Sequence, residues 1–126
     1  MSGPKVVQEL FSLEGDIAVV TGGAGVLPSA MASVLIRAGA KVAVWGRGTH
    51  HPVDEAAEEL RSKTGAGADD IIGVTVDTAE EESVRAALAE TEKRLGMPNI
   101  LVNGVGGNQG KSDFVNIDTE LFEKVV

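Results

Sequence analysis

Short apolar runs alternate with amphipathic segments along the chain, and no other feature of the sequence limits its fold as strongly. Runs typical of strands occupy residues 17–20, 41–45, 71–76 and 100–103. Segments with helical spacing lie between them, at residues 28–37, 53–63 and 80–95. Because the strand-like runs are continuously apolar, we expect strands that are buried on both faces. The pattern predicts an α/β fold with a doubly wound parallel sheet, truncated after about four strands.

The first helical segment carries a specific packing expectation. In residues 28–37 and just beyond, the spacing places Met31, Val34, Leu35 and Ala38 on one apolar face. An amphipathic helix on a buried sheet packs its apolar face inward. The spacing therefore indicates an amphipathic helix over residues 28–37.

Charge and composition exclude several classes of function. The formal net charge is −8 and no basic patch is visible, which argues against a nucleic acid or an anionic membrane as partner. The absence of cysteine excludes disulfides and thiolate chemistry. No apolar run approaches the roughly 20 residues of a membrane span. We therefore expect a soluble, cytoplasmic protein.

The histidine pair His50-His51, followed by Glu55, is the one pattern that suggests a metal site. Two histidines in a polar loop are more often solvated, and no third ligand stands at a diagnostic spacing. We assign no metal.

The stretch TGGAGVL, which begins at Thr21, lies between the first strand-like run and the first helical segment. Its glycines Gly22, Gly23 and Gly25 permit positive φ and leave no Cβ between the backbone and a ligand. The N–H groups at the start of the following helix have no intrahelical partner and point toward an anion. The stretch is a candidate phosphate-binding loop, and the alternative is an ordinary strand-to-helix turn.

This loop resembles the T-G-x-x-x-G-x-G motif of the short-chain dehydrogenases/reductases, through Thr21-Gly22, Gly25 and the pair Val26-Leu27. Two positions depart from the motif. This chain has Val26 where the family motif has its second glycine, and Pro28 where the motif has its third. Proline has no N–H to offer a pyrophosphate, although it suits the first turn of a helix.

The resemblance extends over nearly the whole chain. It continues through residues 38–42, through Asp77 after the third strand, and through residues 103–106 (NGVG), which are similar to the family's N-N-A-G. Within the family, GGAGVL and VNGVGGN look most like the sugar-acid oxidoreductases that include mannonate and fructuronate reductases.

The resemblance implies a Rossmann-like, dinucleotide-binding domain over residues 1–126, incomplete at its C-terminal end. It also implies an NAD(P)-dependent oxidoreductase that transfers hydride between nicotinamide and a carbonyl or hydroxyl substrate. In the family a Ser, a Tyr, a Lys and an Asn carry the chemistry, and their usual positions lie beyond Val126. The chain has no tyrosine. We therefore assign no catalytic residue and expect the chain alone to be inactive.

The end of the second strand bears on the choice of cofactor. Dinucleotide folds that prefer NAD place an Asp or Glu there to bind the ribose 2′-hydroxyl, whereas a nearby Arg accommodates the 2′-phosphate of NADP. At the position of this Asp or Glu the chain has Gly46, which is followed by Arg47. A guanidinium matches phosphate oxygens, so we expect NADP, with NAD as the other possibility. The alternative is that Arg47 is a solvated loop cation.

Asp77 and Thr78 follow the third strand. The resemblance implies that the Asp77 side chain binds the adenine amino group, with the backbone of Thr78 beside it. The alternative is that one of the two caps the helix that starts near Glu80. Both interpretations remain open from the sequence.

The segment after the fourth strand completes the predicted site. By resemblance, Asn103 stabilises the sheet beside the cofactor ribose, and Gly104 and Val105, with Gly106, let the backbone approach the ribose and nicotinamide. In the family's strand order 3-2-1-4, residues 100–102 form an exposed apolar edge strand, a liability for pairing with another chain. We expect a homo-oligomer that binds a dinucleotide and a small carbonyl or hydroxyl substrate.

Two other functions remain open. One is a non-catalytic dinucleotide-binding or sensing module, which Pro28 and the missing tyrosine favour. The other is an α/β scaffold that binds no nucleotide.

Overall fold

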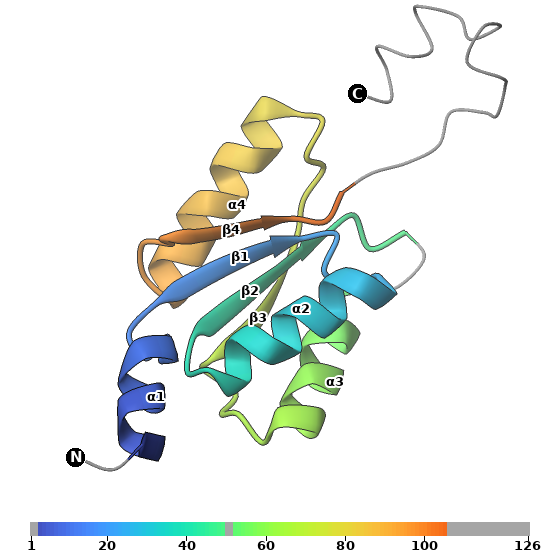
Figure 1. Cartoon of the computed structure of the whole chain (residues 1–126). Coiled ribbons are helices and arrows are strands. Elements are labelled where there is room, and N and C mark those ends of the chain that lie inside the picture. The colour runs from blue at the N-terminus through green and yellow to red at the C-terminus, as the bar shows by residue number, and fades with distance from the viewer. Residues whose placement is uncertain (1–2, 50–51, 106–126) are drawn as a thin grey trace, which may run out of the picture.

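The computed structural model describes residues 3–49 and 52–105, so the histidine pair and Gly106 lie outside the described residues. Within these ranges a parallel sheet of four strands has the order β3-β2-β1-β4. Helices α2 and α3 cover one face of the sheet and α4 covers the other (Figure 1). The elements are α1 (Gly3–Phe11), β1 (Ile17–Thr21), α2 (Val26–Arg37), β2 (Lys41–Gly46), α3 (Val53–Thr64), β3 (Ile71–Thr75), α4 (Glu81–Arg94) and β4 (Ile100–Asn103). The expected doubly wound α/β fold is confirmed.

Parallel pairing brings the carboxyl ends of all four strands to one edge of the sheet. Thr21, the last residue of β1, is paired with Trp45 of β2 and with Asn103 of β4. Strand β3 ends beside β2, with Thr75 paired to Gly46. The loops that follow the four strands therefore leave the sheet at the same edge, where ligands of doubly wound sheets bind.

The two central strands are buried on both faces, as their apolar sequences predict. Val20 and Val44 belong to the core layer under α2 and α3, which also contains Ile36 and Leu60. Trp45 belongs to the layer under α4. Successive residues of a strand point to opposite faces, so a continuously apolar strand fills both layers.

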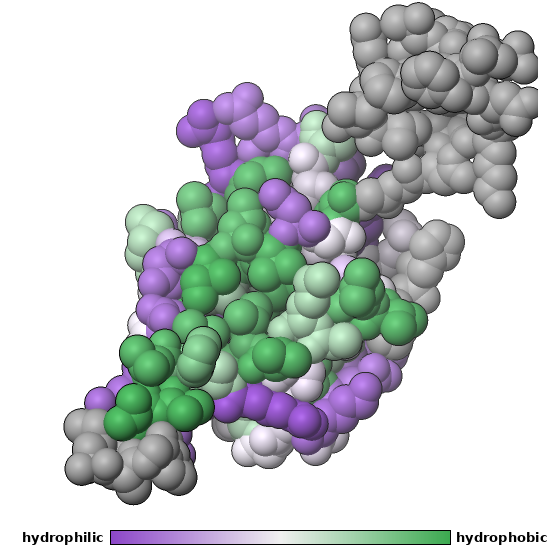
Figure 2. All heavy atoms as spheres, viewed as in Figure 1, coloured by the Kyte–Doolittle hydropathy of each residue, from purple (hydrophilic) through white to green (hydrophobic). Residues whose placement is uncertain are grey.

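The apolar face that the spacing indicated for α2 is buried only in part, because Leu35 packs against the core whereas Met31 and Val34 do not. Ala32 and Ile36 are the buried residues of this helix, whereas the side chains of Met31 and Val34 are 42% and 67% exposed. Almost every residue of α2 is apolar or small, so the sequence offers more than one apolar stripe. The small side chain of Ala32 lets the helix approach the sheet closely, and this contact selects the stripe. Apolar side chains gather on the surface across the front of the molecule as viewed, from α1 over β1 and β4 to α2 (Figure 2).

The start of α2 also differs from expectation. The helix begins at Val26, after Gly25 as its N-cap, so Pro28 is the third helical residue rather than the first. The first intrahelical hydrogen bond runs from the Ser29 N–H to the Gly25 carbonyl, at 3.0 Å. Pro28 therefore breaks no helical hydrogen bond, because residues of the first turn have no intrahelical acceptor.

Two peripheral features complete the fold. Helix α1 was not anticipated from the sequence, and it exposes Leu10 and Phe11, each at 72%. Strand β4 is an edge strand, as expected, with Leu101 62% exposed. Among the described residues no helix is both long enough and apolar enough to cross a membrane.

The loops after β1 and β4 touch backbone to backbone through two glycines. A Cβ added at Gly22 would lie 2.6 Å from the Gly104 carbonyl oxygen. A Cβ added at Gly104 would lie 2.5 Å from Cγ of Pro28, and it would also overlap the Thr21 carbonyl. The Gly104 N–H donates to the carbonyl and to the hydroxyl of Thr21, both at 3.1 Å. Glycine at these positions thus brings the two loops into contact.

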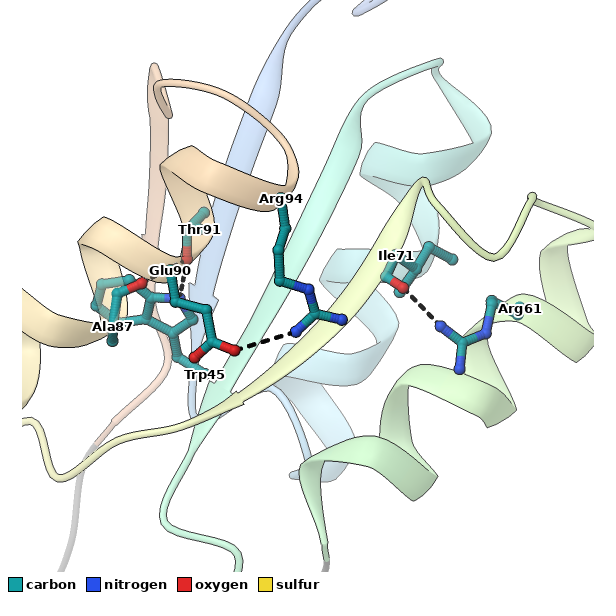
Figure 3. Close-up of polar contacts among 7 residues, drawn as sticks. All are labelled: Trp45, Arg61, Ile71, Ala87, Glu90, Thr91 and Arg94. Carbon is teal, nitrogen blue, oxygen red and sulfur yellow. Dashed lines mark hydrogen bonds and ion pairs between the residues drawn. The ribbon is translucent and has the colours of Figure 1, made fainter.

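A buried hydrogen bond ties α4 to the end of β2. The Trp45 Nε1–H donates to Thr91 Oγ1 at 3.1 Å, and the same hydroxyl donates to the Ala87 carbonyl at 2.8 Å (Figure 3). Trp45 is 5% exposed and Thr91 is fully buried. Because Trp45 is followed directly by Gly46 and Arg47, this bond holds the strand end from which the loop after β2 departs.

Replacing Thr91 with valine tests this bond. Thr91→Val keeps the shape of the side chain but leaves the indole N–H buried without a partner, which costs about 1–3 kcal/mol of unfolding free energy. Urea denaturation followed by circular dichroism measures the loss. Thr75→Val, at an exposed position of β3, is the matched control and should stay within about 0.5 kcal/mol. Equal losses in the two variants would contradict the structural role of the bond.

Replacing Gly104 with alanine tests the contact between the loops. The new Cβ overlaps backbone and the proline ring, so Gly104→Ala should destabilise the fold by about 1–3 kcal/mol. Gly67→Ala is the control, because a Cβ there comes no closer than 3.3 Å, to the carboxylate of Asp70. The same urea titration applies. A Gly104→Ala variant as stable as Gly67→Ala would show that the loops are not held this closely.

Candidate functional site

The structure brings the predicted site residues of all four strand-end loops to one edge of the sheet. The glycine loop follows β1, Arg47 follows β2, Asp77 and Thr78 follow β3, and Asn103 closes β4. The N-terminus of α2 opens onto the same edge, because it begins directly after the glycine loop.

The glycines shape the loop, and the N–H groups of Gly23 and Gly25 are used within it. Gly22 has a φ of +66°, which few residues other than glycine adopt. The Gly23 N–H donates to the Trp45 carbonyl at 3.3 Å, and the Gly25 N–H donates to the Gly22 carbonyl at 2.9 Å. A Cβ at Gly23 would lie 2.6 Å from Val44 Cγ1. The loop is therefore held against the end of β2 by its own backbone.

The first turn of α2 offers N–H donors to an anion. The helix begins at Val26, so the N–H groups of Val26 and Leu27 have no intrahelical acceptor, and Pro28 has no N–H at all. Both apolar side chains point to solvent, with Val26 93% exposed and Leu27 65% exposed. The positive end of the helix dipole adds to the attraction of these N–H groups for a phosphate. The first turn thus supplies two donors where a helix without proline supplies three.

Arg47 lies at the mouth of a hollow between the ends of β2 and β3. The hollow has a volume of about 340 Å³ and is lined by Arg47, Thr49, Thr75, Val76, Asp77 and Ser83. Arg47 is exposed, and across the described ranges the structure records no hydrogen bond or ion pair for its guanidinium. A guanidinium that has no recorded partner among the described residues can take a phosphate as its ligand.

Asp77 does not cap α4, so the capping alternative is wrong for both Asp77 and Thr78. The N-cap of α4 is Glu80, and no side chain bonds to the end of this helix as a cap. Instead, Oδ1 of Asp77 accepts the Ala79 N–H at 3.0 Å, which closes an Asx turn. Asp77 and Thr78 are both half-buried at the end of β3.

The end of β4 is tied to the glycine loop by Thr21, which the sequence analysis did not single out as a site residue. Its hydroxyl donates to the Val102 carbonyl at 3.4 Å and accepts the Gly104 N–H at 3.1 Å. Asn103 and Val105 are exposed at this edge. A polar residue that ends a buried strand directly before a glycine loop is the signal that could have identified Thr21.

Ser83 is the second residue that the sequence analysis missed. It lines the hollow beside Asp77, and its Oγ accepts the Asp77 N–H at 2.9 Å. Its place in the first turn of α4, six residues after Asp77, gives no sequence signal of this contact.

Within the described ranges, no group of three or more His, Asp or Glu residues could hold a metal ion.

Comparisons with known proteins agree with this geometry. The family model described as short chain dehydrogenase matches residues 16–126. The 2-dehydro-3-deoxy-D-gluconate 5-dehydrogenase of Formosa agariphila is 37% identical over 98 residues, which cover 78% of this chain and 36% of that protein.

Two solved structures overlay on the chain. L-sorbose reductase from Gluconobacter frateurii, complexed with NADPH and L-sorbose, has a TM-score of 0.72 at 27% identity, over 87% of this chain and 40% of its own. The 3-ketoacyl-(acyl-carrier-protein) reductase from Brucella melitensis, complexed with NADH, has a TM-score of 0.70 at 27% identity. The match covers 90% of this chain and 44% of that protein's chain. The chain spans less than half the length of each of these three proteins. Because the family model matches residues 16–126, the chain belongs to the short-chain dehydrogenase family.

Proposed function

We propose that the protein is an NAD(P)-dependent oxidoreductase of the short-chain dehydrogenase type, in which residues 1–126 supply the dinucleotide-binding part. The proposal rests on one observation: three groups lie at the same edge of the sheet. These groups are the free N–H donors of α2, the guanidinium of Arg47 and the carboxylate of Asp77. They match a pyrophosphate, a ribose phosphate and a base amino group in the order in which a dinucleotide presents them.

In the proposed complex each group has one task. The N–H groups of Val26 and Leu27 bind the pyrophosphate, and Asp77 binds the adenine amino group with the Thr78 backbone beside it. Asn103, Gly104 and Val105 lie along the ribose and the nicotinamide. The cofactor supplies the hydride, and the protein's residues bind and orient it. Gly22, Gly23 and Gly25 keep the loop close enough to β2 and β4 for this arrangement.

NADP is the proposed cofactor. A Cβ at Gly46, the place of the acid in NAD-binding folds, would lie 3.0 Å from Val53 Cγ1, so a larger side chain requires Val53 to shift. Arg47, the next residue, is exposed and lines the hollow at the ends of β2 and β3. A bidentate guanidinium contact to a 2′-phosphate then favours NADPH over NADH.

The proposed substrate is a small carbonyl or hydroxyl compound of the sugar-acid or sugar class. The support is that one relative is a dehydrogenase of a sugar acid and that one solved neighbour holds L-sorbose. The chain contains no tyrosine, so we place no phenol-based proton transfer on it. We further propose that the protein is cytoplasmic and homo-oligomeric, and the apolar edge strand β4 supports the second of these.

A non-catalytic dinucleotide-binding or sensing module is the second candidate. Pro28 favours it, because the first turn of α2 offers one donor fewer to the pyrophosphate. A spectrophotometric assay of NADPH oxidation with sugar-acid substrates, performed on the product of the full coding sequence, distinguishes the two. Turnover identifies an enzyme, and tight NADPH binding without turnover on any carbonyl substrate identifies a sensing module.

Replacing Arg47 tests the proposed cofactor preference. The expected result of Arg47→Ala is an NADPH affinity lower by about 10- to 100-fold, because charged hydrogen bonds to the 2′-phosphate are lost, and a nearly unchanged NADH affinity. Quenching of Trp45, the single tryptophan of the chain, reports binding as ligand is added.

The control for this prediction is Arg37→Ala, which removes the same charge at the far end of α2. It should leave both affinities unchanged. An equal loss of NADPH and NADH binding in Arg47→Ala would contradict the assigned phosphate contact. No binding of either dinucleotide at millimolar concentration would overturn the proposed function itself.

A further inference from the structure

Ser83 holds the backbone of Asp77 from the first turn of α4. The sheet pairing of this segment ends with the Val76 N–H, which donates to the Gly46 carbonyl at 2.8 Å. The next N–H, that of Asp77, has left the sheet and donates to Ser83 Oγ at 2.9 Å. Ser83 is half-buried and is the third residue of α4, so its position is set by a regular helix.

The other polar groups of Asp77 are also held, with one exception. The Asp77 carbonyl accepts the Glu80 N–H at 3.0 Å, and Oδ1 accepts the Ala79 N–H at 3.0 Å. For Oδ2 the structure records no partner within residues 3–49 and 52–105, and Arg47 forms no ion pair with it there. One carboxylate oxygen of Asp77 is therefore without a recorded partner among the described residues, while the backbone N–H and carbonyl of Asp77 are both hydrogen-bonded.

Asp77 and Ser83 line the same hollow as Arg47 and Thr75. A carboxylate accepts hydrogen bonds and donates none, so a ligand group that meets the free oxygen must be a donor. The exocyclic amino group of adenine is a donor, whereas the oxo group at the same position of hypoxanthine is an acceptor. A site that presents a fixed acceptor should thus distinguish an amino-purine from an oxo-purine.

We propose that Ser83 is a positioning residue for base recognition: its hydroxyl anchors Asp77 so that the free carboxylate oxygen selects an amino-purine dinucleotide. This inference rests on the proposed function, because it requires that a dinucleotide binds at this edge. Without the Ser83 hydroxyl, the Asp77 N–H loses its partner and the loop can turn the carboxylate away from the base. Selectivity for the base should then fall, while contacts to the phosphates persist.

The test compares reduced NADP with its hypoxanthine analogue, using Trp45 quenching on the full chain. Wild-type protein should bind NADPH about 10-fold more tightly than the analogue. Ser83→Ala should weaken NADPH binding about 5- to 10-fold and leave the analogue within twofold, so that the preference largely disappears. Ser83→Thr keeps the hydroxyl and should restore the preference to within threefold of wild type.

The matched control is Ser33→Ala, a half-buried serine of α2 that does not line this hollow. It should leave the preference unchanged. If Ser83→Ala weakens both ligands equally, Ser83 has only a structural role and the inference is overturned while the proposed function stands. If wild-type protein binds neither ligand at millimolar concentration, the inference and the proposed function both fail.

Asp77→Asn gives an independent result that does not depend on the folding of a Ser83 variant. The asparagine carbonyl can still accept the Ala79 N–H, and its amide then offers a donor to the base. The variant should shift the preference toward the hypoxanthine analogue. A variant that keeps the wild-type preference for NADPH would overturn the assignment of base selection to this carboxylate, and with it the role of Ser83.

Discussion

The burial of β1 and β2 on both faces is the constraint from which the other features of this structure follow. Strands made of valine, alanine and isoleucine have no face that water solvates well, so helices must cover both sides of the sheet. In this chain they do so as crossovers between parallel strands, which need a long connection of this kind. Parallel strands end at a common edge, and the loops after β1, β2, β3 and β4 consequently meet there. The position of the candidate site therefore follows from the packing of the core.

The glycine loop has two separate tasks in this chain. Its glycines bring backbones together, through the contact of Gly22 with Gly104 and the hydrogen bond from Gly23 to the Trp45 carbonyl. The first turn of α2 then presents free N–H groups to a ligand. Pro28 affects these tasks differently. Its ring fills the space beside Gly104, which supports the fold, while its missing N–H reduces the number of donors.

Much of this arrangement could be predicted, and the errors have a common cause. The strands lie within one residue of their expected bounds, because apolar runs and the glycines between them are local signals. The buried face of α2 was predicted only in part, with Leu35 right and Met31 and Val34 wrong, since a helix with several apolar stripes can pack in several ways. Arg47 and Asp77 were identified as candidates by their places at strand ends. Ser83 was missed, because its contact depends on how the turn between β3 and α4 folds back.

The sequence by itself determined the alternation of strands and helices, the parallel sheet, and the glycine-rich loop between β1 and α2. These properties depend on a residue and its near neighbours along the chain. Only the tertiary structure decided that α2 packs on Ala32 and Ile36, that the free donors belong to Val26 and Leu27, and that Ser83 holds Asp77. The physical reason is that burial and hydrogen-bond pairing are settled by competition among groups that meet only when the sheet and its helices pack together.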